Sequence, residues 1–213
     1  LAVGRQTVTE KTNIYGLFVD TVGRKIPLRI QSADGSTRTA TVIPTTARRH
    51  GALRYDTWVE QRRQLTDEYS GGRLGYLHIH SMDISSFENF ERDLQAAGEG
   101  KDGLVIDVRS NGGGWTTDYL LATLMVQRHA FTVPRDDTSG VKAYPQSRLP
   151  LAAWTRPSVT ICNEDSYSNA EIFSHAFKTL ERGPLVGETT FGAVISTGAH
   201  GLPGGGFGPH QAR

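Results

Sequence analysis

The chain has 213 residues, of which 37% are hydrophobic and 21% charged, a balance typical of a globular protein rather than a disordered one. Its 23 basic and 22 acidic side chains leave a net charge of +1, which gives no electrostatic reason to expect nucleic acid as a partner. No apolar run approaches the roughly 20 residues that a membrane-spanning helix needs, so no membrane partner is predicted. Cys162 is the single cysteine and lies in a predicted strand, where we expect a buried structural thiol.

Residues 1–45 have the pattern of a small β-rich lobe. The period-two alternation near residues 25–31 predicts a strand, an Asp-Gly pair at 34–35 predicts a hairpin turn, and residues 38–43 return as a second strand. Asn13 is placed to cap a short helix before this hairpin. Strand, turn, short helix and hairpin in this order resemble the second half of a PDZ domain. We therefore expect a partial PDZ domain, with an unrelated β-rich lobe as the alternative.

The rest of the chain divides by pattern into a connector, a large domain and a tail. Residues 46–72 carry apolar side chains at helical spacing and end in two glycines, which predicts a helical connector. Residues 73–200 alternate between strand and helix patterns, which predicts an α/β fold with a mainly parallel sheet and flanking helices. Residues 201–213 are rich in glycine and proline and predict an irregular tail. The chain starts without Met and ends in this tail, so we expect a fragment at both ends.

Within the large domain the predicted strands are short. They cover residues 74–80, 103–108, 159–162, 185–186 and 193–195. A capping box of Ser85 and Glu88 predicts the start of the first helix, a second helix follows the glycines at 112–114, and a third follows Ser168. The apolar faces expected for the first and third helices are Phe87, Phe90, Leu94 and Ala97, and Ile172, Phe173, Ala176, Phe177 and Leu180. Residues 129–157, rich in proline, are predicted to be a loop.

The stretch Asn111-Gly112-Gly113-Gly114 follows a buried strand and precedes a helix. Successive glycines let the backbone turn sharply and leave its N–H groups open to a ligand, and the start of a helix favours an anion or a developing oxyanion. A phosphate-binding loop is disfavoured, because no Gly-Lys-Ser/Thr or G-x-G-x-x-G pattern is present. A purely structural turn is the other alternative.

Ser168 lies at the corner between the strand at 159–162 and the helix that follows. A hydroxyl at such a corner points out of the sheet edge beside the N–H groups of the helix start, where it can act as a nucleophile. The alternatives are an N-cap role for Ser168 and a nucleophilic role for Ser166. The order of buried strand, glycine loop, helix, long loop, buried strand and Ser-x-Ser-x-x-Glu favours Ser168.

These motifs, in this order, resemble the tail-specific (carboxyl-terminal processing) serine protease family over roughly residues 73–198. A strand that ends in Asp-x-Arg-x-Asn-x-Gly-Gly is matched by Asp107, Arg109, Asn111, Gly113 and Gly114. The later Ser-x-x-Glu and Gly-x-x-Thr-x-Gly motifs are matched by Ser168, Glu171, Gly187, Thr190 and Gly192. The resemblance implies a ClpP/crotonase-like fold preceded by a PDZ domain, and a serine endopeptidase that uses no cofactor and no metal.

One position sorts the chain within that family. Members with a Ser–Lys dyad carry a lysine after Gly-x-x-Thr-x-Gly, and Ala193 occupies that position here. The chain is more similar to tricorn-type proteases, which share the motifs at residues 75–79, 107–114 and 163–168. Those enzymes take a His base and a supporting Glu from segments before the PDZ domain and well after the Gly-x-x-Thr strand. Neither segment is found in this chain.

The resemblance implies acyl transfer with Ser168 as the nucleophile. The N–H groups of Asn169 and of Gly114, or alternatively Gly113, are then expected to form the oxyanion hole, where one donor is typically worth ~3 kcal/mol of the barrier. Without its base such a site is expected to have a very low residual rate, because the members of a triad act as a unit.

Other titratable groups are expected to have supporting roles. Asp107 and Arg109 are placed to buttress the glycine loop. His78 and His80 alternate on one face of a strand as a metal pair would, but no acidic or cysteine ligand has a suitable spacing, so a structural placement is favoured. His175 lies two turns along the helix after Ser168, too far to act as its base.

The substrate that the resemblance implies is a peptide or an unfolded protein, bound by a homo-oligomer in the cytoplasm. Exported members of the family supply the alternative location. Two other functions stay open because the base and its supporting acid are missing from the chain: a non-catalytic ligand- or peptide-binding module of the same fold, and an inactive fragment. Substrate preference is expected to depend on the loop at 129–157 and on parts outside the chain.

Overall fold

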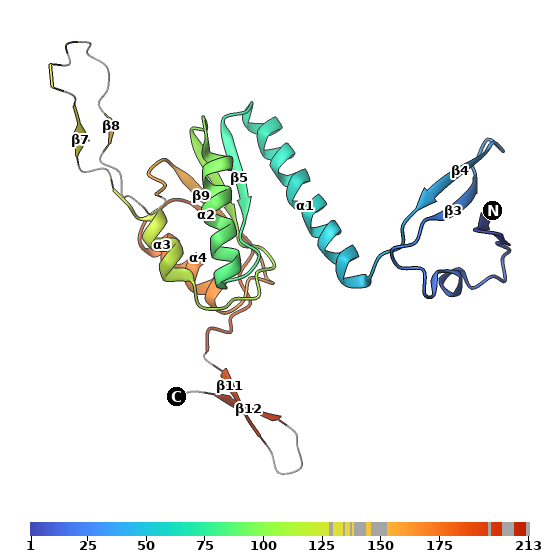
Figure 1. The fold of residues 1–213 in the computed structure, drawn as a ribbon. Helices are drawn as coiled ribbons and strands as arrows, with labels where there is room; N and C mark the ends of the chain where they lie inside the picture. The colour runs from blue at the N-terminus through green and yellow to red at the C-terminus, as the bar shows by residue number, and fades with distance from the viewer. Residues whose placement is uncertain are drawn as a thin grey trace. The chain divides into compact units, whose positions relative to one another are not determined.

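The computed structural model describes residues 1–127, 130–133, 135–136, 138, 144–145, 153–195, 197–201 and 207–211. Two compact units make up the chain, residues 1–58 and residues 59–213. The division falls inside helix α1 (Ala47–Ser70), which covers most of the predicted connector and ends at Gly71 and Gly72, both with positive φ (Figure 1). Among the described residues, no helix is both long and apolar enough to cross a membrane.

The first unit holds a four-stranded antiparallel sheet with the order β2-β1-β3-β4. Its elements are β1 (Ala2–Val3), β2 (Gln6–Thr7), the 3-10 helix η1 (Ile14–Phe18), β3 (Ile26–Gln31) and β4 (Thr37–Val42). The predicted cap is confirmed, because the Asn13 side chain accepts hydrogen bonds from the N–H groups of Tyr15 and Gly16. The predicted hairpin is confirmed by the pairing of β3 with β4. The assignment of this lobe to a PDZ domain stays a prediction.

The second unit is built on a four-stranded parallel sheet with the order β10-β9-β6-β5. Its main elements are β5 (Leu74–His78), α2 (Ile84–Gly98), β6 (Gly103–Asp107), α3 (Thr117–Leu124), β9 (Ser158–Cys162), α4 (Asn169–Thr179) and β10 (Leu185–Gly187). The strands follow one another in space as they do in the chain, so every crossover steps in the same direction. Because parallel crossovers are right-handed, α2, α3 and α4 are expected on one face of the sheet.

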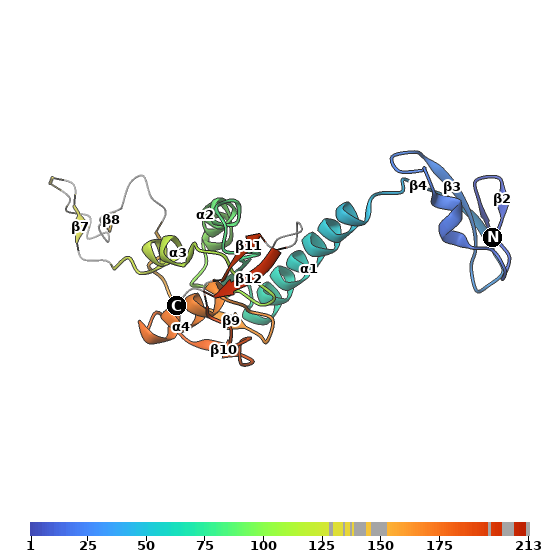
Figure 2. The same ribbon diagram turned by 90° about the horizontal axis from the view of Figure 1, so that it is seen from below.

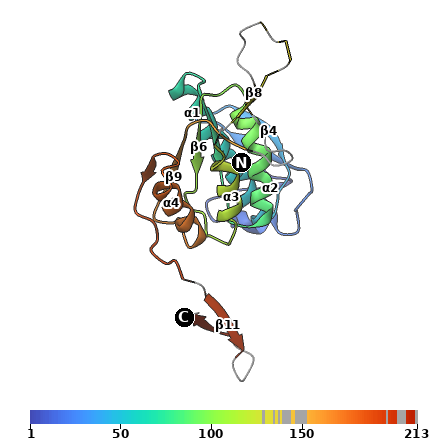
Figure 3. The ribbon, with the colours of Figure 1, turned by 90° about the vertical axis from the view of Figure 1, so that its left-hand side faces the viewer.

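The views agree with this topology. The three helices lie together in Figures 1 and 2, and β6 and β9 lie side by side in Figure 3, as their pairing requires. The predicted α/β fold with a mainly parallel sheet and flanking helices is therefore confirmed.

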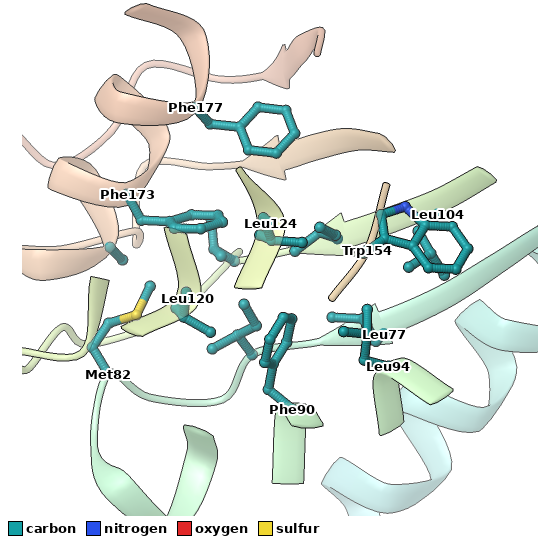
Figure 4. Close-up of a cluster of buried hydrophobic side chains, with 14 of the residues drawn as sticks. Leu77, Met82, Phe90, Leu94, Leu104, Leu120, Leu124, Trp154, Phe173 and Phe177 are labelled. Atoms are coloured by element: carbon teal, nitrogen blue, oxygen red, sulfur yellow. The ribbon is translucent and has the colours of Figure 1, made fainter. Parts of the chain in front are cut away.

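Alternation along the strands decides which side chains form the core. Leu104, Ile106 and Val108 belong to one buried cluster, whereas Asp107 lies on the opposite face of β6. The cluster joins the three helices to the sheet, with contributions such as Leu77, Phe90, Leu94, Leu120, Leu124, Phe173 and Phe177 (Figure 4). Burying each of these large side chains contributes roughly 1.5–3 kcal/mol to folding. Cys162 is buried beside them, as predicted.

The start of α2 differs from the prediction. Its N-cap is Asp83, whose carboxylate accepts the Ser86 N–H at 2.7 Å, and not a capping box of Ser85 and Glu88. An aspartate in extended conformation directly before the first helical residue reaches the third N–H of the helix, so the helix begins before Ser85. The predicted apolar face of this helix is confirmed, since Phe90 and Leu94 belong to the core cluster and Phe87 and Ala97, partly buried, pack against it.

Two predictions near the end of the sheet are wrong. Ile172 and Leu180 are 39% and 50% exposed rather than part of the buried face of α4, because that face is narrower than predicted. Residues 193–195 form no strand. The Ala193 N–H there donates to the Glu171 side chain at 3.1 Å, so it is not available to a strand partner.

Two short strand pairs lie in segments predicted to be irregular. β11 (Thr197–Gly201) pairs antiparallel with β12 (Phe207–Gln211), so the tail predicted for residues 201–213 is not irregular throughout. β7 (Phe131–Thr132) pairs with β8 (Tyr144–Pro145) in the predicted loop. Ladder hydrogen bonds join backbone groups, so glycine and proline weaken the strand signal without excluding a strand. Residues 129, 134, 137, 139–143 and 146–152 of the predicted loop lie outside the described residues.

A glycine in β5 is required by the close approach of α2 to the sheet. A Cβ at Gly75 would lie 1.9 Å from the carbonyl oxygen of Ala97 and 2.8 Å from a methyl carbon of Leu104. We expect Gly75→Ala to lower the free energy of unfolding by about 1–3 kcal/mol, because the backbone must shift to admit the methyl group. Urea or thermal unfolding measures this change.

The control is Gly51→Ala in α1, where a Cβ would meet nothing within 4 Å. Alanine favours a helix over glycine by about 1 kcal/mol, so this variant is expected to be at least as stable as the wild-type protein. Equal stability of the two variants would contradict the close packing of α2 on β5.

Candidate active site

Three segments that follow strands of the parallel sheet meet at its carboxyl edge, which is where open α/β sheets bind their ligands. Residues 79–82 follow β5, residues 108–114 follow β6, and residues 163–168 follow β9. Met82 and Gly114 form a parallel β-bridge there. The glycine loop is therefore held as a short continuation of the sheet.

Asn111 joins these three segments from a fully buried position. Its side-chain N–H donates to the Ile79 carbonyl at 2.8 Å, and its side-chain oxygen accepts the Gly113 N–H at 2.9 Å. Its backbone carbonyl accepts the Tyr167 N–H at 2.9 Å. One amide residue thus fixes the end of β5, the glycine loop and the serine corner relative to one another.

The backbone requires glycine at the second and third positions of the triplet, but not at the first. Gly113 has φ +85°, and a Cβ there would lie 2.8 Å from the Cβ of Ser168. Gly114 has φ +143°, and a Cβ there would lie 2.0 Å from the Met82 carbonyl oxygen. Gly112 has no positive φ and would meet nothing within 4 Å. Gly113 and Gly114 therefore bring the loop backbone against the serine corner.

The backbone donors of the site are distinguished by their hydrogen bonds. The Gly113 N–H is occupied by Asn111, whereas no hydrogen bond among the described residues uses the N–H of Gly114 or of Asn169. Both of these open donors border the same pocket of ≈ 530 Å³ as Ser168. The residues that line this pocket are Gly114, Trp115, Tyr167, Ser168, Asn169, Ile172, Val194 and Ile195.

Ser168 has the backbone of a strained corner rather than that of an ordinary helix cap. It is the N-cap of α4, with φ 55° and ψ −116°, whereas an ordinary N-cap is extended, as Asp83 is with φ −116° and ψ 170°. Ser168 is joined to Glu171 in a capping box, in which the Glu171 side chain accepts the Ser168 N–H at 2.8 Å, and the Glu171 N–H also donates to the Ser168 carbonyl at 2.9 Å. Strain of this kind costs about 1–3 kcal/mol and is typical of a nucleophile elbow, which exposes a hydroxyl at a strand-to-helix turn. Helix capping alone does not explain this conformation.

Ser166, the competing candidate from the sequence, is a structural residue. It is fully buried, and its hydroxyl donates to the Val108 carbonyl at 2.9 Å while accepting the Asn163 N–H at 3.0 Å. A hydroxyl with both roles filled inside the protein cannot reach a substrate. It holds the serine corner against the end of β6.

Glu171 fastens the serine corner to the loop that follows β10. The side chain is only 6% exposed and accepts the Ser168 N–H at 2.8 Å. It also accepts the Thr190 hydroxyl and the N–H groups of Gly192 and Ala193. Burial raises the pKa of the Glu171 carboxyl, but these four donors outweigh burial and bring the pKa below its ordinary value. Ala193 stands where members of the family with a Ser–Lys dyad carry the lysine, and here its backbone N–H donates to Glu171.

Sequence reasoning missed Thr117 as a member of the site. Its N–H and its hydroxyl both donate to Asn169, which lies 52 residues away in the chain. No local motif signals a contact across that distance, and a threonine at the start of a helix has many ordinary roles.

A buried polar group lies on the opposite face of the sheet. Asp107 is fully buried and accepts hydrogen bonds from the Arg109 guanidinium at 2.5 Å and the Tyr76 hydroxyl at 2.8 Å. Burial, together with the charge of Asp107, raises the pKa of Tyr76, and burial lowers the pKa of His78. His78 donates from Nε2 to the Arg109 carbonyl at 2.9 Å, which agrees with the structural placement favoured from the sequence.

Two further expectations concern metals and His175. Among the described residues, no group of three or more His, Cys, Asp or Glu side chains could hold a metal ion. His175 lies on α4 with its ring 3.4 Å from the Thr179 hydroxyl. Among the described residues no hydrogen bond joins His175 to Ser168, and its distance from the corner stays a prediction.

Comparison with known proteins identifies the family. Residues 73–208 match the model of peptidase family S41, which is more than half of the chain, so the chain belongs to that family. Tricorn protease homolog 1 of Streptomyces coelicolor is 37% identical over 198 residues, covering 92% of this chain and 17% of the relative. The tricorn protease of Thermoplasma volcanium is 33% identical over 183 residues, covering 86% and 17%. A carboxyl-terminal-processing protease of Synechocystis sp. is 30% identical over 133 residues, covering 61% and 30%.

A solved structure agrees with these relatives. The crystal structure of the tricorn protease matches with a TM-score of 0.73 and 29% identity, covering 93% of this chain and 18% of that one. The resemblance to tail-specific proteases, and to the tricorn type among them, is thus confirmed. The chain spans only 17% of the length of the two tricorn relatives named above.

The lowered pKa of Glu171 predicts how its contribution depends on pH. A carboxyl whose pKa is lower in the folded state stabilises that state above its unfolded pKa, near 4.5, and this stabilisation is lost as the pH falls through the folded value. We expect Glu171→Gln to lower the free energy of unfolding by about 2 kcal/mol at pH 7. The difference from wild type is expected to shrink as the pH falls below 4.5.

Urea unfolding at a series of pH values measures this difference. Glu188→Gln, a change at an exposed glutamate of the neighbouring loop, is the control and is expected to have little effect. A Glu171→Gln effect that stays constant from neutral to acid pH would show that the charge of Glu171 does not matter.

Proposed function

We propose that this chain carries the nucleophile and the oxyanion hole of a serine peptidase of the tricorn or tail-specific type. Ser168 is the nucleophile, and the N–H groups of Gly114 and Asn169 are the oxyanion donors. The alternative donor considered from the sequence, Gly113, serves the site through its conformation, because its N–H is bound to Asn111.

One observation carries this proposal. A strained, partly exposed serine stands in one pocket with two backbone N–H groups that no other group of the described chain uses. Helix capping does not account for the strain, and the two open donors, one at the start of α4 and one in the exposed part of the glycine loop, border the same pocket as the serine. Both are what acyl transfer needs: an exposed hydroxyl, and fixed donors where negative charge develops.

The reaction follows from this arrangement. Ser168 Oγ attacks a peptide carbonyl carbon, its proton passes to a general base, and the carbonyl oxygen becomes an oxyanion held by Gly114 and Asn169. Collapse of this intermediate breaks the C–N bond, the amine leaves with a proton, and water later releases the acyl group. Among the described residues no histidine or lysine hydrogen-bonds the Ser168 hydroxyl. We therefore place the base outside the described part of the chain, in keeping with the greater length of the tricorn relatives.

The family also supports wider proposals about the protein. Residues 73–200 form the main part of the catalytic domain, residues 46–72 are a helical connector, and residues 1–45 are a partial PDZ domain. The substrate is a peptide or an unfolded protein. The resemblance to tricorn-type enzymes favours a homo-oligomer in the cytoplasm.

The second candidate function is a non-catalytic binding module of the same fold. The missing base among the described residues favours it. The strained backbone of Ser168 argues against it, because a module that only binds gains nothing from an exposed nucleophile.

Two serines provide the test of the nucleophile. In the full-length protein, a fluorophosphonate probe is expected to label Ser168, and Ser168→Ala is expected to abolish both labelling and peptidase activity while the fold is retained. Ser166→Ala is the control. It is expected to lower the free energy of unfolding by about 1–3 kcal/mol, because it removes the partner of buried backbone groups, while labelling persists. A folded full-length protein that the probe does not label at Ser168 would refute the proposal.

The glycine triplet tests the oxyanion loop. The expected result is that Gly112→Ala leaves labelling and activity near wild type, whereas Gly113→Ala and Gly114→Ala lower the labelling rate at least about 100-fold, the cost of losing one oxyanion donor. The physical reason is that only the last two require positive φ and close approach to the serine corner. Labelling rates and circular dichroism spectra of the three variants are the measurements. Equal behaviour of all three would mean that the loop does not take part.

A further inference from the structure

Thr117 and Asn169 connect two helix starts. Thr117 is the first residue of α3, and Asn169 is the first residue of α4. The Thr117 N–H donates to the Asn169 side-chain oxygen at 3.0 Å, and the Thr117 hydroxyl lies 2.9 Å from both that oxygen and the Asn169 carbonyl oxygen. Thr117 is 3% exposed and Asn169 is 9% exposed. The contact is therefore shielded from water, where hydrogen bonds are stronger.

The contact replaces an ordinary cap of α3. The N-cap residue of that helix, Thr116, makes no capping hydrogen bond through its own side chain. Asn169 accepts the Thr117 N–H instead, so one of the N–H groups left open at the start of α3 is satisfied by a residue of another helix. The start of α3 is therefore capped by the first residue of α4, which joins the two helix starts.

Each of the two proposed oxyanion donors lies next to this contact. Asn169 carries one donor on its own backbone, and Gly114 carries the other only three residues before Thr117. The contact between Thr117 and Asn169 therefore ties together the two segments that carry these N–H groups. Oxyanion donors act only when they are fixed near 2.7–3.1 Å from the developing charge, so small displacements lower the rate.

We infer that Thr117 is a positioning residue of the oxyanion hole, which sets the distance between the N–H groups of Gly114 and Asn169 through its hydroxyl. This inference rests on the proposed function, because it concerns the same site. Thr117 touches neither the substrate nor the reacting atoms, and it acts through Asn169.

The test uses matched threonine variants of the full-length protein. Thr117→Val removes the hydroxyl but keeps the shape of the side chain and the backbone N–H, whereas Thr117→Ser keeps the hydroxyl. Thr123→Val is the control, since Thr123 lies on the same helix, is 4% exposed, and donates its hydroxyl only within the helix, to the Tyr119 carbonyl at 3.3 Å. The measurements are the rate of fluorophosphonate labelling at Ser168, kcat and KM for a fluorogenic peptide, and the melting temperature.

A positioning role predicts a specific pattern. Thr117→Val is expected to lower the labelling rate and kcat by at least about tenfold, less than the loss of a whole donor, with KM within about twofold of wild type. Thr117→Ser is expected to restore most of the rate, and Thr123→Val is expected to label like wild type. Wild-type labelling of Thr117→Val, or losses that equal those of Thr123→Val at equal melting temperature, would overturn the inference. Absence of labelling in the wild-type protein would instead refute the proposed function itself.

Discussion

The buried amide of Asn111 is the constraint on which the candidate site depends. A side-chain amide offers donors and an acceptor from one rigid plane, and here the nitrogen donates to the Ile79 carbonyl and the oxygen accepts the Gly113 N–H. Replacing it would leave buried N–H and C=O groups unpaired on both sides, which costs far more than the gain from forming an average hydrogen bond. The amide therefore keeps the glycine loop in one arrangement with the end of β5, and the backbone carbonyl of Asn111 adds the serine corner by accepting the Tyr167 N–H.

Strain at Ser168 can persist because several neighbouring groups hold its backbone. Glu171 holds the N–H of Ser168, and the hydroxyl of Ser166 holds the preceding turn against Val108. Gly113 fills the space beside the serine in which any larger residue would collide. Each of these groups is buried or has its polar atoms paired, so relaxation of the strained dihedrals would break several hydrogen bonds at once. The hydrogen bonds and packing of the folded protein therefore offset the free-energy cost of the strained backbone.

The sequence was sufficient for those features that have a local signal. The apolar run of β6, the helical spacing of Phe90 and Leu94, and the glycines before α3 each determine structure within a few residues, and the order of these elements implied the parallel sheet.

Features made by distant residues could not be predicted. The bond between Thr117 and Asn169 spans 52 residues, and the four donors of Glu171 include three from the loop after β10. Two local patterns led to wrong predictions. At the start of α2, Asp83 caps the helix in place of the predicted Ser85. In the tail, β11 and β12 pair although the sequence is rich in glycine.

The position of β9 in the sheet has a consequence for the serine corner. Because the order is β10-β9-β6-β5, β9 is an inner strand, and the turn that follows it has a neighbouring turn on each side. The neighbour after β6 supplies the glycine loop, and the neighbour after β10 supplies the groups bound by Glu171. A serine after an outermost strand would have only one of these supports. The serine corner is therefore held by two loops. A structural change in either loop is expected to alter the position of the Ser168 hydroxyl.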